Sequence, residues 1–174
     1  MGQRAMNQMQ LLLLTDVEKG YLAGFFDGEG CIAINVVRKK NYINRVASGS
    51  VFTTYRLHVR LASTDYEALE WLLELVGGAI YDHYGKGDFS KRGNRKAAWV
   101  WHLGGPQARP FLEMLSPLCR IKKRQIALAL DFLNLGRACA PEQREEFYHQ
   151  FRALNARGLT PYERESEPTS LEDS

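Results

Sequence analysis

The sequence contains little sulfur and no long apolar run. Its 174 residues include only three cysteines, whose spacing matches no common metal site. An odd number of cysteines argues against a disulfide-stapled domain and favours a reducing compartment. The run from Leu11 to Leu14 is far too short to cross a bilayer. Because no targeting signal stands out, we expect an intracellular protein of a bacterial cytoplasm or an organelle.

Excess charge of one sign is also small, but it is unevenly distributed. The chain has a net charge of +3, and residues 160–174 carry five acidic groups and one arginine. The rest of the chain therefore carries about +7. A basic body favours a polyanionic partner, although a charge of this size is common in proteins that bind none.

The length fits one domain of ordinary size. We expect a flexible leader over residues 1–14, a single domain over residues 15–158 and an acidic, disordered tail over residues 159–174. No internal repeat is visible, so each chain offers one copy of every motif.

The most informative stretch is YLAGFFDGEG, at residues 21–30. If it is helical, Gly20, Gly24 and Gly28 are four residues apart and lie along one stripe. A stripe without side chains lets another backbone approach closely. We therefore expect this helix to pack against a second protein helix.

Two acidic residues, Asp27 and Glu29, lie at the C-terminal end of the same helix. The helix dipole disfavours negative charge there, and a bound cation would offset that cost. The alternative is that both acids are solvated and that Gly28 or Gly30 is simply a helix cap.

Residues 22–30, LAGFFDGEG, resemble the signature of the LAGLIDADG homing endonucleases. In that family, paired copies of this helix pack at a two-fold or pseudo-two-fold axis. The resemblance implies that Glu29 binds the catalytic metal with help from the Gly28 carbonyl. Aspartate is commoner at this position, and glutamate keeps the charge while adding a methylene. The residues implied for the dimer interface are Gly20, Ala23, Gly24 and Asp27.

Two strands are predicted after the motif. Residues 31–38 are rich in β-branched side chains, and residues 55–63 alternate between apolar and cationic. The predicted core faces consist of Ile32, Ile34, Val36, Leu57, Val59 and Leu61. A ribbon with one cationic face fits the DNA major groove, where arginine reads guanine. An ordinary solvated sheet face is the alternative interpretation.

The remaining elements are predicted from caps and periodicity. Thr15 or Asp16 caps the first helix, which we expect to end near Phe26. A second helix follows the cap Asp65 and ends at the glycine pair 77–78. Strands are predicted over residues 79–84 and 98–103, and helices over residues 107–115, 120–135 and 141–156. Residues 38–50 and 85–96 form basic hairpin tips, which are either solvated or contact phosphates.

This element order resembles the αββαββα order of the LAGLIDADG family, and it implies an α+β saddle with an antiparallel sheet and C-terminal helices. One motif per chain implies a homodimer on a long pseudo-palindromic double-stranded DNA target. The activity implied is intron-encoded, site-specific hydrolysis of both strands, with Mg²⁺ or another divalent cation such as Mn²⁺. The alternatives are an intron RNA maturase and a non-catalytic DNA-binding protein on the same fold.

The family also places a basic residue near the active site, at the start of the helix after the fourth strand. The best match is Lys122, with Lys123 as the alternative if the register is off by one. This cation would stabilise transition-state charge or help to activate water. The family's water-positioning residue matches Ser63. The DNA-reading residues chosen by strand alternation are Asn35, Lys39, Arg56, His58, Arg60, Tyr81 and His83.

Overall fold

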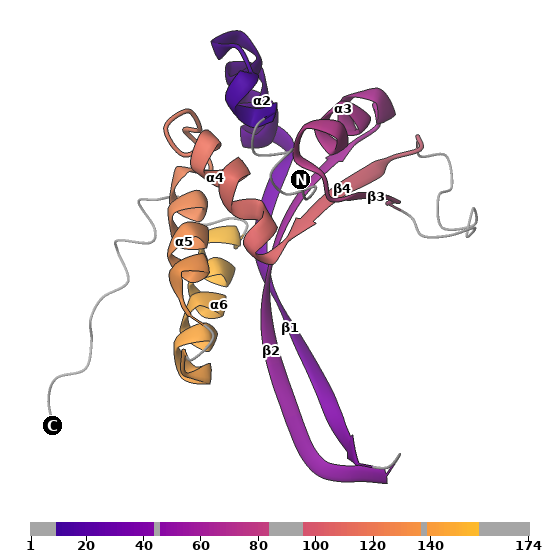
Figure 1. Cartoon of the computed structure of the whole chain (residues 1–174), viewed down its shortest axis with the longest axis vertical. Coiled ribbons are helices and arrows are strands. Elements are labelled where there is room, and N and C mark those ends of the chain that lie inside the picture. The colour runs from indigo at the N-terminus through magenta and orange to yellow at the C-terminus, as the bar shows by residue number, and fades with distance from the viewer. Residues whose placement is uncertain (1–9, 44–45, 84–95, 137–138, 157–174) are drawn as a thin grey trace, which may run out of the picture.

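The fold is built on a central antiparallel sheet. The computed structural model describes residues 10–43, 46–83, 96–136 and 139–156. Four strands pair in the order β1-β2-β4-β3, and helices pack against one face of the sheet (Figure 1). The strands β1 and β2 form a long hairpin that extends beyond the helices. The predicted α+β architecture is confirmed.

The first long helix, α2, spans Asp16–Glu29. Thr15 is its cap: the Thr15 hydroxyl accepts the Glu18 N–H, and the Glu18 carboxylate accepts the Thr15 N–H at 2.7 Å. The helix continues past its predicted end at Phe26. It stops at Gly30, where any side chain would collide with the Phe26 carbonyl and ring.

The folded domain begins earlier than the predicted leader allows. Residues 10–13 form a helical turn, and Leu11 and Leu14 are buried in the core. Burial of each leucine contributes about 1.5–3 kcal/mol, which is enough to hold this segment against the domain. Residues 1–9 and the predicted acidic tail lie outside the described residues.

The strands of the hairpin are longer than predicted. β1 spans Gly30–Ile43 and β2 spans Val46–Ser63, with one register shift between Lys40 and Tyr42. The polar residues beyond 38 extend the ladder because backbone hydrogen bonds do not depend on an apolar side-chain pattern. The second predicted tip, over residues 85–96, lies outside the described part of the chain except for its last residue.

The remaining elements follow the predicted order. They are α3 (Tyr66–Val76), β3 (Ala79–Asp82), β4 (Trp99–Gly104), the 3-10 turn η2 (Gly105–Ala108), α4 (Arg109–Leu115), α5 (Lys123–Asn134) and α6 (Pro141–Asn155). The cap of α3 is Asp65, as predicted. The helix predicted over 107–115 is divided into η2 and α4, and α5 begins at Lys123 instead of residue 120.

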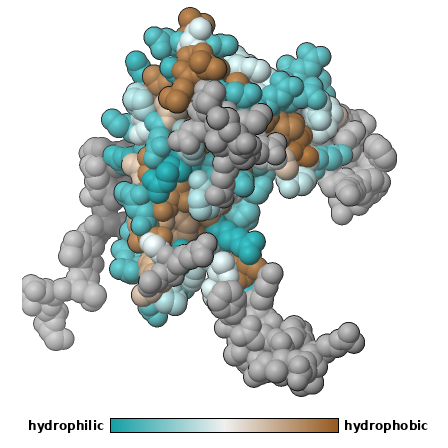
Figure 2. Space-filling view, viewed as in Figure 1, coloured by the Kyte–Doolittle hydropathy of each residue, from teal (hydrophilic) through white to brown (hydrophobic). Residues whose placement is uncertain are grey.

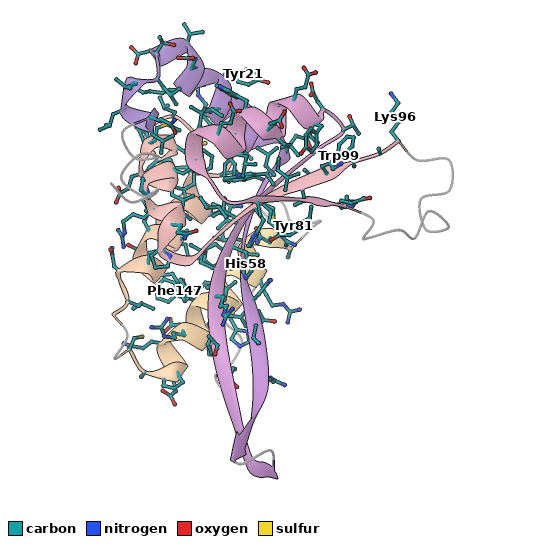
Figure 3. All side chains as sticks on the ribbon, turned by 45° about the vertical axis from the view of Figure 1, so that its right-hand side comes forward. Tyr21, His58, Tyr81, Lys96, Trp99 and Phe147 are labelled. Carbon is teal, nitrogen blue, oxygen red and sulfur yellow. The ribbon has the colours of Figure 1, made fainter. Side chains whose placement is uncertain are left out.

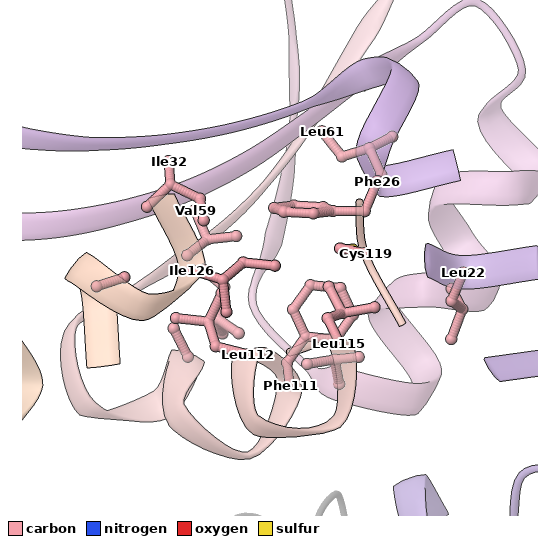
Figure 4. Packing of buried hydrophobic residues seen from close by; sticks show 14 of the residues in the cluster. Leu22, Phe26, Ile32, Val59, Leu61, Phe111, Leu112, Leu115, Cys119 and Ile126 are labelled. Carbon is pink, nitrogen blue, oxygen red and sulfur yellow. The ribbon is translucent and has the colours of Figure 1, made fainter. Parts of the chain in front are cut away.

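The core lies between the helices and one face of the sheet. Alternate strand residues such as Ile32 and Val59 face side chains of α4 and α5 (Figure 4). Phe111 of α4 makes edge-to-face contacts with Phe26 at 5.6 Å and with Trp101 at 5.4 Å. Within the described ranges, none of the helices is long and apolar enough to cross a membrane.

Candidate functional site

The strand register places the cationic side chains of β2 on the face of the sheet opposite the core. Across the four strands, Arg60 lies opposite both Cys31 and His102, and His102 also lies opposite Ala79. Directly paired residues in antiparallel strands point to the same face. We call this surface the open face. Its polar side chains include Cys31, Asn35, Arg56, His58, Arg60, Tyr81 and His102.

The predicted DNA-reading residues are therefore brought together. Arg56 and Arg60 are exposed, and His58 and Tyr81 lie where the hairpin joins the rest of the sheet (Figure 3). His83 directly follows β3 and is exposed. Lys39 continues the same alternation in β1, but its side chain lies outside the described part of the structure.

Two histidines contact each other at the centre of the open face. His58 Nδ1 lies 2.5 Å from His102 Nε2, and the ring centroids are 4.6 Å apart. Partial burial lowers the pKa of both rings, and repulsion from Arg60 lowers each pKa further. A neutral pair, with one ring donating to the other, is therefore the stable form at neutral pH.

His102 was absent from the predicted set of DNA-reading residues. That set contains no residue of the fourth strand, in which Trp101 is buried in the core. The same alternation places Val100 and His102 on the opposite face, next to Arg60. Strand alternation alone could therefore have identified this histidine.

Glu29 is the last residue of α2, and its side chain is exposed. In the described part of the chain no hydrogen bond or ion pair engages its carboxylate. The last turn of α2 contains no basic residue, so the helix itself supplies no cation to offset the acids there. An exposed carboxylate at a helix C-terminus is suited to binding a cation.

The helix end also offers backbone oxygens. The Gly30 N–H donates to the Phe26 carbonyl. The carbonyls of the residues after Phe26, including Gly28, accept no hydrogen bond within the helix. Carboxylate and carbonyl oxygens are the ligands that Mg²⁺ and Ca²⁺ prefer. Among the described residues, no cluster of three or more His, Cys, Asp or Glu side chains could hold a metal. Glu29 and Gly28 thus fit part of a divalent-cation site.

Asp27 has a different environment from Glu29. Its carboxylate accepts the N–H of Arg120 at 2.7 Å and the N–H of Lys122 at 2.9 Å. Partial burial raises its pKa, but the backbone donors of residues 120–122 outweigh burial and hold the pKa below its usual range. Asp27 therefore stays charged and binds its own chain.

Cys119 lies next to the Asp27 carboxylate. Its thiol is buried and lies 3.6 Å from the Ala23 carbonyl. Burial, the negative charge of Asp27 and a hydrogen bond to Asp27 raise the pKa of Cys119 to about 12. This thiol therefore stays protonated and acts as a donor to α2.

Lys122 is the residue that immediately precedes α5 and serves as its N-cap. Its side chain is half-buried, whereas the neighbouring side chains of Arg120 and Lys123 are exposed. The bonds to Asp27 hold residues 120–122 outside the helix, which explains why α5 starts later than predicted. The Asp27 contact therefore brings Lys122 to the end of α2 that carries Glu29.

Ser63 lies at the end of β2, as predicted, but on the core side of the sheet. It pairs with Trp99, in the row of Leu61 and Trp101. Its hydroxyl accepts the Asp65 N–H at 3.0 Å. One acceptor site of Ser63 is thus used to shape the turn into α3, and its assignment to water positioning stays a prediction.

The glycine stripe of α2 faces outward. Gly20, Gly24 and Gly28 are all exposed, and a methyl group added at any of them would meet nothing within 4 Å. Beside them, Val17 is 82% exposed and Tyr21 is 55% exposed. Hydrophobic residues gather at this end of the molecule (Figure 2). The stripe is therefore available to a partner helix.

Two of the residues predicted at the dimer interface face inward instead. Ala23 is 4% exposed and belongs to the core of its own chain. Asp27 is bound to residues 120–122. Ala23 is rotated by about 100° from Gly24 around the helix axis, whereas Asp27 lies close to the glycine stripe but is bound by residues 120–122 of its own chain.

Comparison with known proteins identifies the sequence motif. Residues 22–99 match the family model described as LAGLIDADG endonuclease. No curated protein sequence matches the chain.

Solved structures with a similar fold include homing endonucleases in complex with DNA. The homing endonuclease I-CvuI with its target is 19% identical, with a TM-score of 0.62 over 82% of this chain and 84% of that one. The archaeal intron-encoded homing endonuclease I-Vdi141I with DNA is 16% identical, with a TM-score of 0.63 over 84% and 89%. The homing endonuclease I-SmaMI bound to cleaved DNA is 17% identical, with a TM-score of 0.54 over 84% of this chain and 46% of that one.

Proposed function

Because residues 22–99 belong to the LAGLIDADG endonuclease family and the chain has that family's fold, we propose that this protein is a site-specific DNA endonuclease of the homing type. Its substrate is double-stranded DNA, and its reaction is hydrolysis of one phosphodiester bond in each strand. The proposal rests on the Glu29 carboxylate at the end of α2, which is exposed and has no hydrogen bond or ion pair with any described residue.

The hydrolysis depends on a divalent cation, Mg²⁺ or Mn²⁺. Glu29 and the Gly28 carbonyl would hold it, because hard oxygen ligands suit these ions. When bound, the ion supplies charge stabilisation to the attacking and leaving oxygens. The Lys122 ammonium adds positive charge next to the scissile phosphate.

The active form is a homodimer. The exposed stripe of Gly20, Gly24 and Gly28 allows two copies of α2 to approach closely, and the adjoining Val17 and Tyr21 are exposed apolar side chains that a second copy would cover. Two copies of Glu29 then lie near one symmetry axis, one for each DNA strand. A two-fold protein implies a nearly palindromic target.

The open face contacts the DNA. Arg56 and Arg60 are exposed donors that fit the guanine edge in the major groove. The contacting rings of His58 and His102 add nitrogen atoms to the same face. A two-stranded ribbon is narrow enough to enter that groove. The hairpin β1–β2 has this form and carries these side chains along one face.

Glu29→Gln tests the proposed role directly. The substitution removes the charge that binds the cation and keeps the shape of the side chain. We expect DNA cleavage to fall by at least about a hundredfold, as for loss of a main electrostatic group, while the Kd for DNA changes little. Cleavage is measured as single-turnover nicking and linearisation of plasmid, and binding is measured in Ca²⁺.

Glu74→Gln is the matched control, because Glu74 is an exposed glutamate in the last turn of α3. It should leave cleavage unchanged. Full cleavage by the Glu29 variant would refute the assignment. Tight binding by the wild type without cleavage in Mg²⁺ or Mn²⁺ would instead indicate a non-catalytic DNA-binding protein.

A further inference from the structure

The Asp27 carboxylate joins the two elements that carry the proposed reacting groups. Its Oδ2 accepts the N–H of Arg120 at 2.7 Å, and its Oδ1 accepts the N–H of Lys122 at 2.9 Å. Glu29 lies only two residues further along α2, which is about 3 Å along a helix axis. One rigid contact therefore links the backbone of Lys122 to the helix end that holds Glu29.

This contact does more than cap a helix locally. The N–H groups before and at the start of α5 have no carbonyl partner within the helix, and the N-cap Lys122 makes no side-chain capping bond. Ordinary caps, such as Asp65 with Ala68, come from a residue three positions away. The cap of residues 120–122 comes from another helix, more than ninety positions earlier in the chain. It therefore fixes the start of α5 relative to the end of α2.

The surroundings keep this contact intact under working conditions. Each carboxylate oxygen of Asp27 accepts one backbone N–H, at 2.7 Å and at 2.9 Å, so both oxygens are engaged by residues 120–122. The buried Cys119 thiol forms a hydrogen bond with the Asp27 carboxylate and stays protonated. The Lys122 side chain is half-buried, and its backbone N–H is held by the Asp27 carboxylate.

We propose that Asp27 is a positioning residue for cleavage, which fixes the backbone of residues 120–122 so that the Lys122 ammonium reaches the phosphate bound at Glu29. This inference rests on the proposed endonuclease function. It assigns Asp27 to the cleavage step, acting through Lys122, and not to DNA binding.

Asp27→Asn is the first test, because it removes the charge and one acceptor oxygen at constant size. We expect the single-turnover cleavage rate to fall about tenfold to a hundredfold, the effect of a displacement of about 1 Å, with the Kd for DNA within about twofold. Asp65→Asn is the matched control, since it makes the same change at an aspartate that caps α3, outside the contact between α2 and residues 120–122. Equal losses in the two variants would overturn the proposal.

A double-mutant cycle with Lys122→Ala separates positioning from stability. If Asp27 acts through Lys122, Asp27→Asn should change the cleavage rate by less than about twofold in the Lys122→Ala background. An undiminished effect of Asp27→Asn in that background would overturn the proposal. Asp27→Glu, which keeps the charge but displaces it by one methylene, replaces Asp27→Asn if circular dichroism shows that the asparagine variant is unfolded.

A second readout is independent of cleavage and so distinguishes failure of this inference from failure of the proposed function. The half-buried Lys122 and the exposed Lys123 are methylated with formaldehyde and a borohydride, and their relative rates are read by mass spectrometry. We expect Asp27→Asn to raise the rate at Lys122 toward that of Lys123. An unchanged ratio would overturn the positioning role, whereas a wild type that cleaves no DNA would overturn only the endonuclease assignment.

Discussion

Two carboxylates at the end of α2 have opposite environments because of helix geometry. Residues two positions apart on a helix point in nearly opposite directions, about 200° around the axis. Asp27 therefore points into its own chain, where backbone N–H groups bind it, and Glu29 points outward. The pattern of two acids was visible in the sequence. Their different roles depend on residues 120–122, which are distant in sequence and could not be placed beforehand.

The contacting histidines make stability depend on pH. Burial and nearby positive charge lower the pKa of His58 and His102, so the unfolded chain binds protons more readily than the folded one. Their contribution to stability is therefore present above about pH 6.5, the ordinary value for histidine, and is lost as the pH falls through the lowered pKa values. We expect Tm to decrease between about pH 7.5 and pH 5.5.

His102→Gln should flatten this pH dependence, because a single remaining imidazole loses the repulsion from its partner. Tm is measured by circular dichroism across the same pH range. His149→Gln is the control, since His149 is exposed on α6 and is not part of the open face. Identical pH profiles for the wild type and the His102 variant would contradict the assigned coupling.

At the scale of elements, α2 combines an inward face and an outward face in one short segment. Leu22, Ala23 and Phe26 are buried in the core. Gly20 and Gly24 are exposed, with open space beyond each Cα. An isolated subunit gains nothing from exposed glycines, which lower helix stability by about 1 kcal/mol each relative to alanine. Close packing against a second helix gives them a function.

Gly24→Leu should convert the protein into a monomer. A leucine side chain prevents two α2 backbones from approaching closely, yet it improves the intrinsic helix propensity of an exposed position. We therefore expect a lower mass in sedimentation velocity with no loss of helical signal. Ala127→Leu, at an exposed position of α5, is the control and should leave the mass unchanged. A Gly24 variant that sediments like the wild type would exclude this interface.

The sequence predicted the elements whose side chains follow a strict period. Alternation in β2 correctly separated Leu57, Val59 and Leu61 from the cationic side chains. It could not show how far the polar hairpin extends, because backbone pairing leaves no side-chain pattern. It also could not show that Leu11 and Leu14 are buried, since a short apolar run has no period.

At the scale of the whole molecule, the core and the cationic surface occupy opposite faces of one sheet. The helices bury one face, and Arg56 and Arg60 remain exposed on the other. The net charge of +3 understates the basic character of the rest of the chain, because residues 160–174 are acidic. A protein with a cationic face of this kind should bind DNA with an affinity that falls steeply with salt.

Arg56→Gln should weaken DNA binding and reduce the slope of log Kd against log salt, by about one if the side chain neutralises a phosphate. If it reads a base, the loss is about 1–3 kcal/mol and is confined to one target position. Arg152→Gln is the control, because Arg152 lies on α6 over the Tyr148 ring. Equal effects of the two substitutions would show that the open face does not bind DNA specifically.

The most direct measurement is a cleavage screen of a randomised plasmid library in Mg²⁺ and in Mn²⁺, followed by sequencing of both cut ends. We expect linear products cut in both strands within one long, nearly palindromic sequence. Folded, DNA-binding protein that yields no linear product in either cation would contradict it, as would cuts at sites without two-fold symmetry.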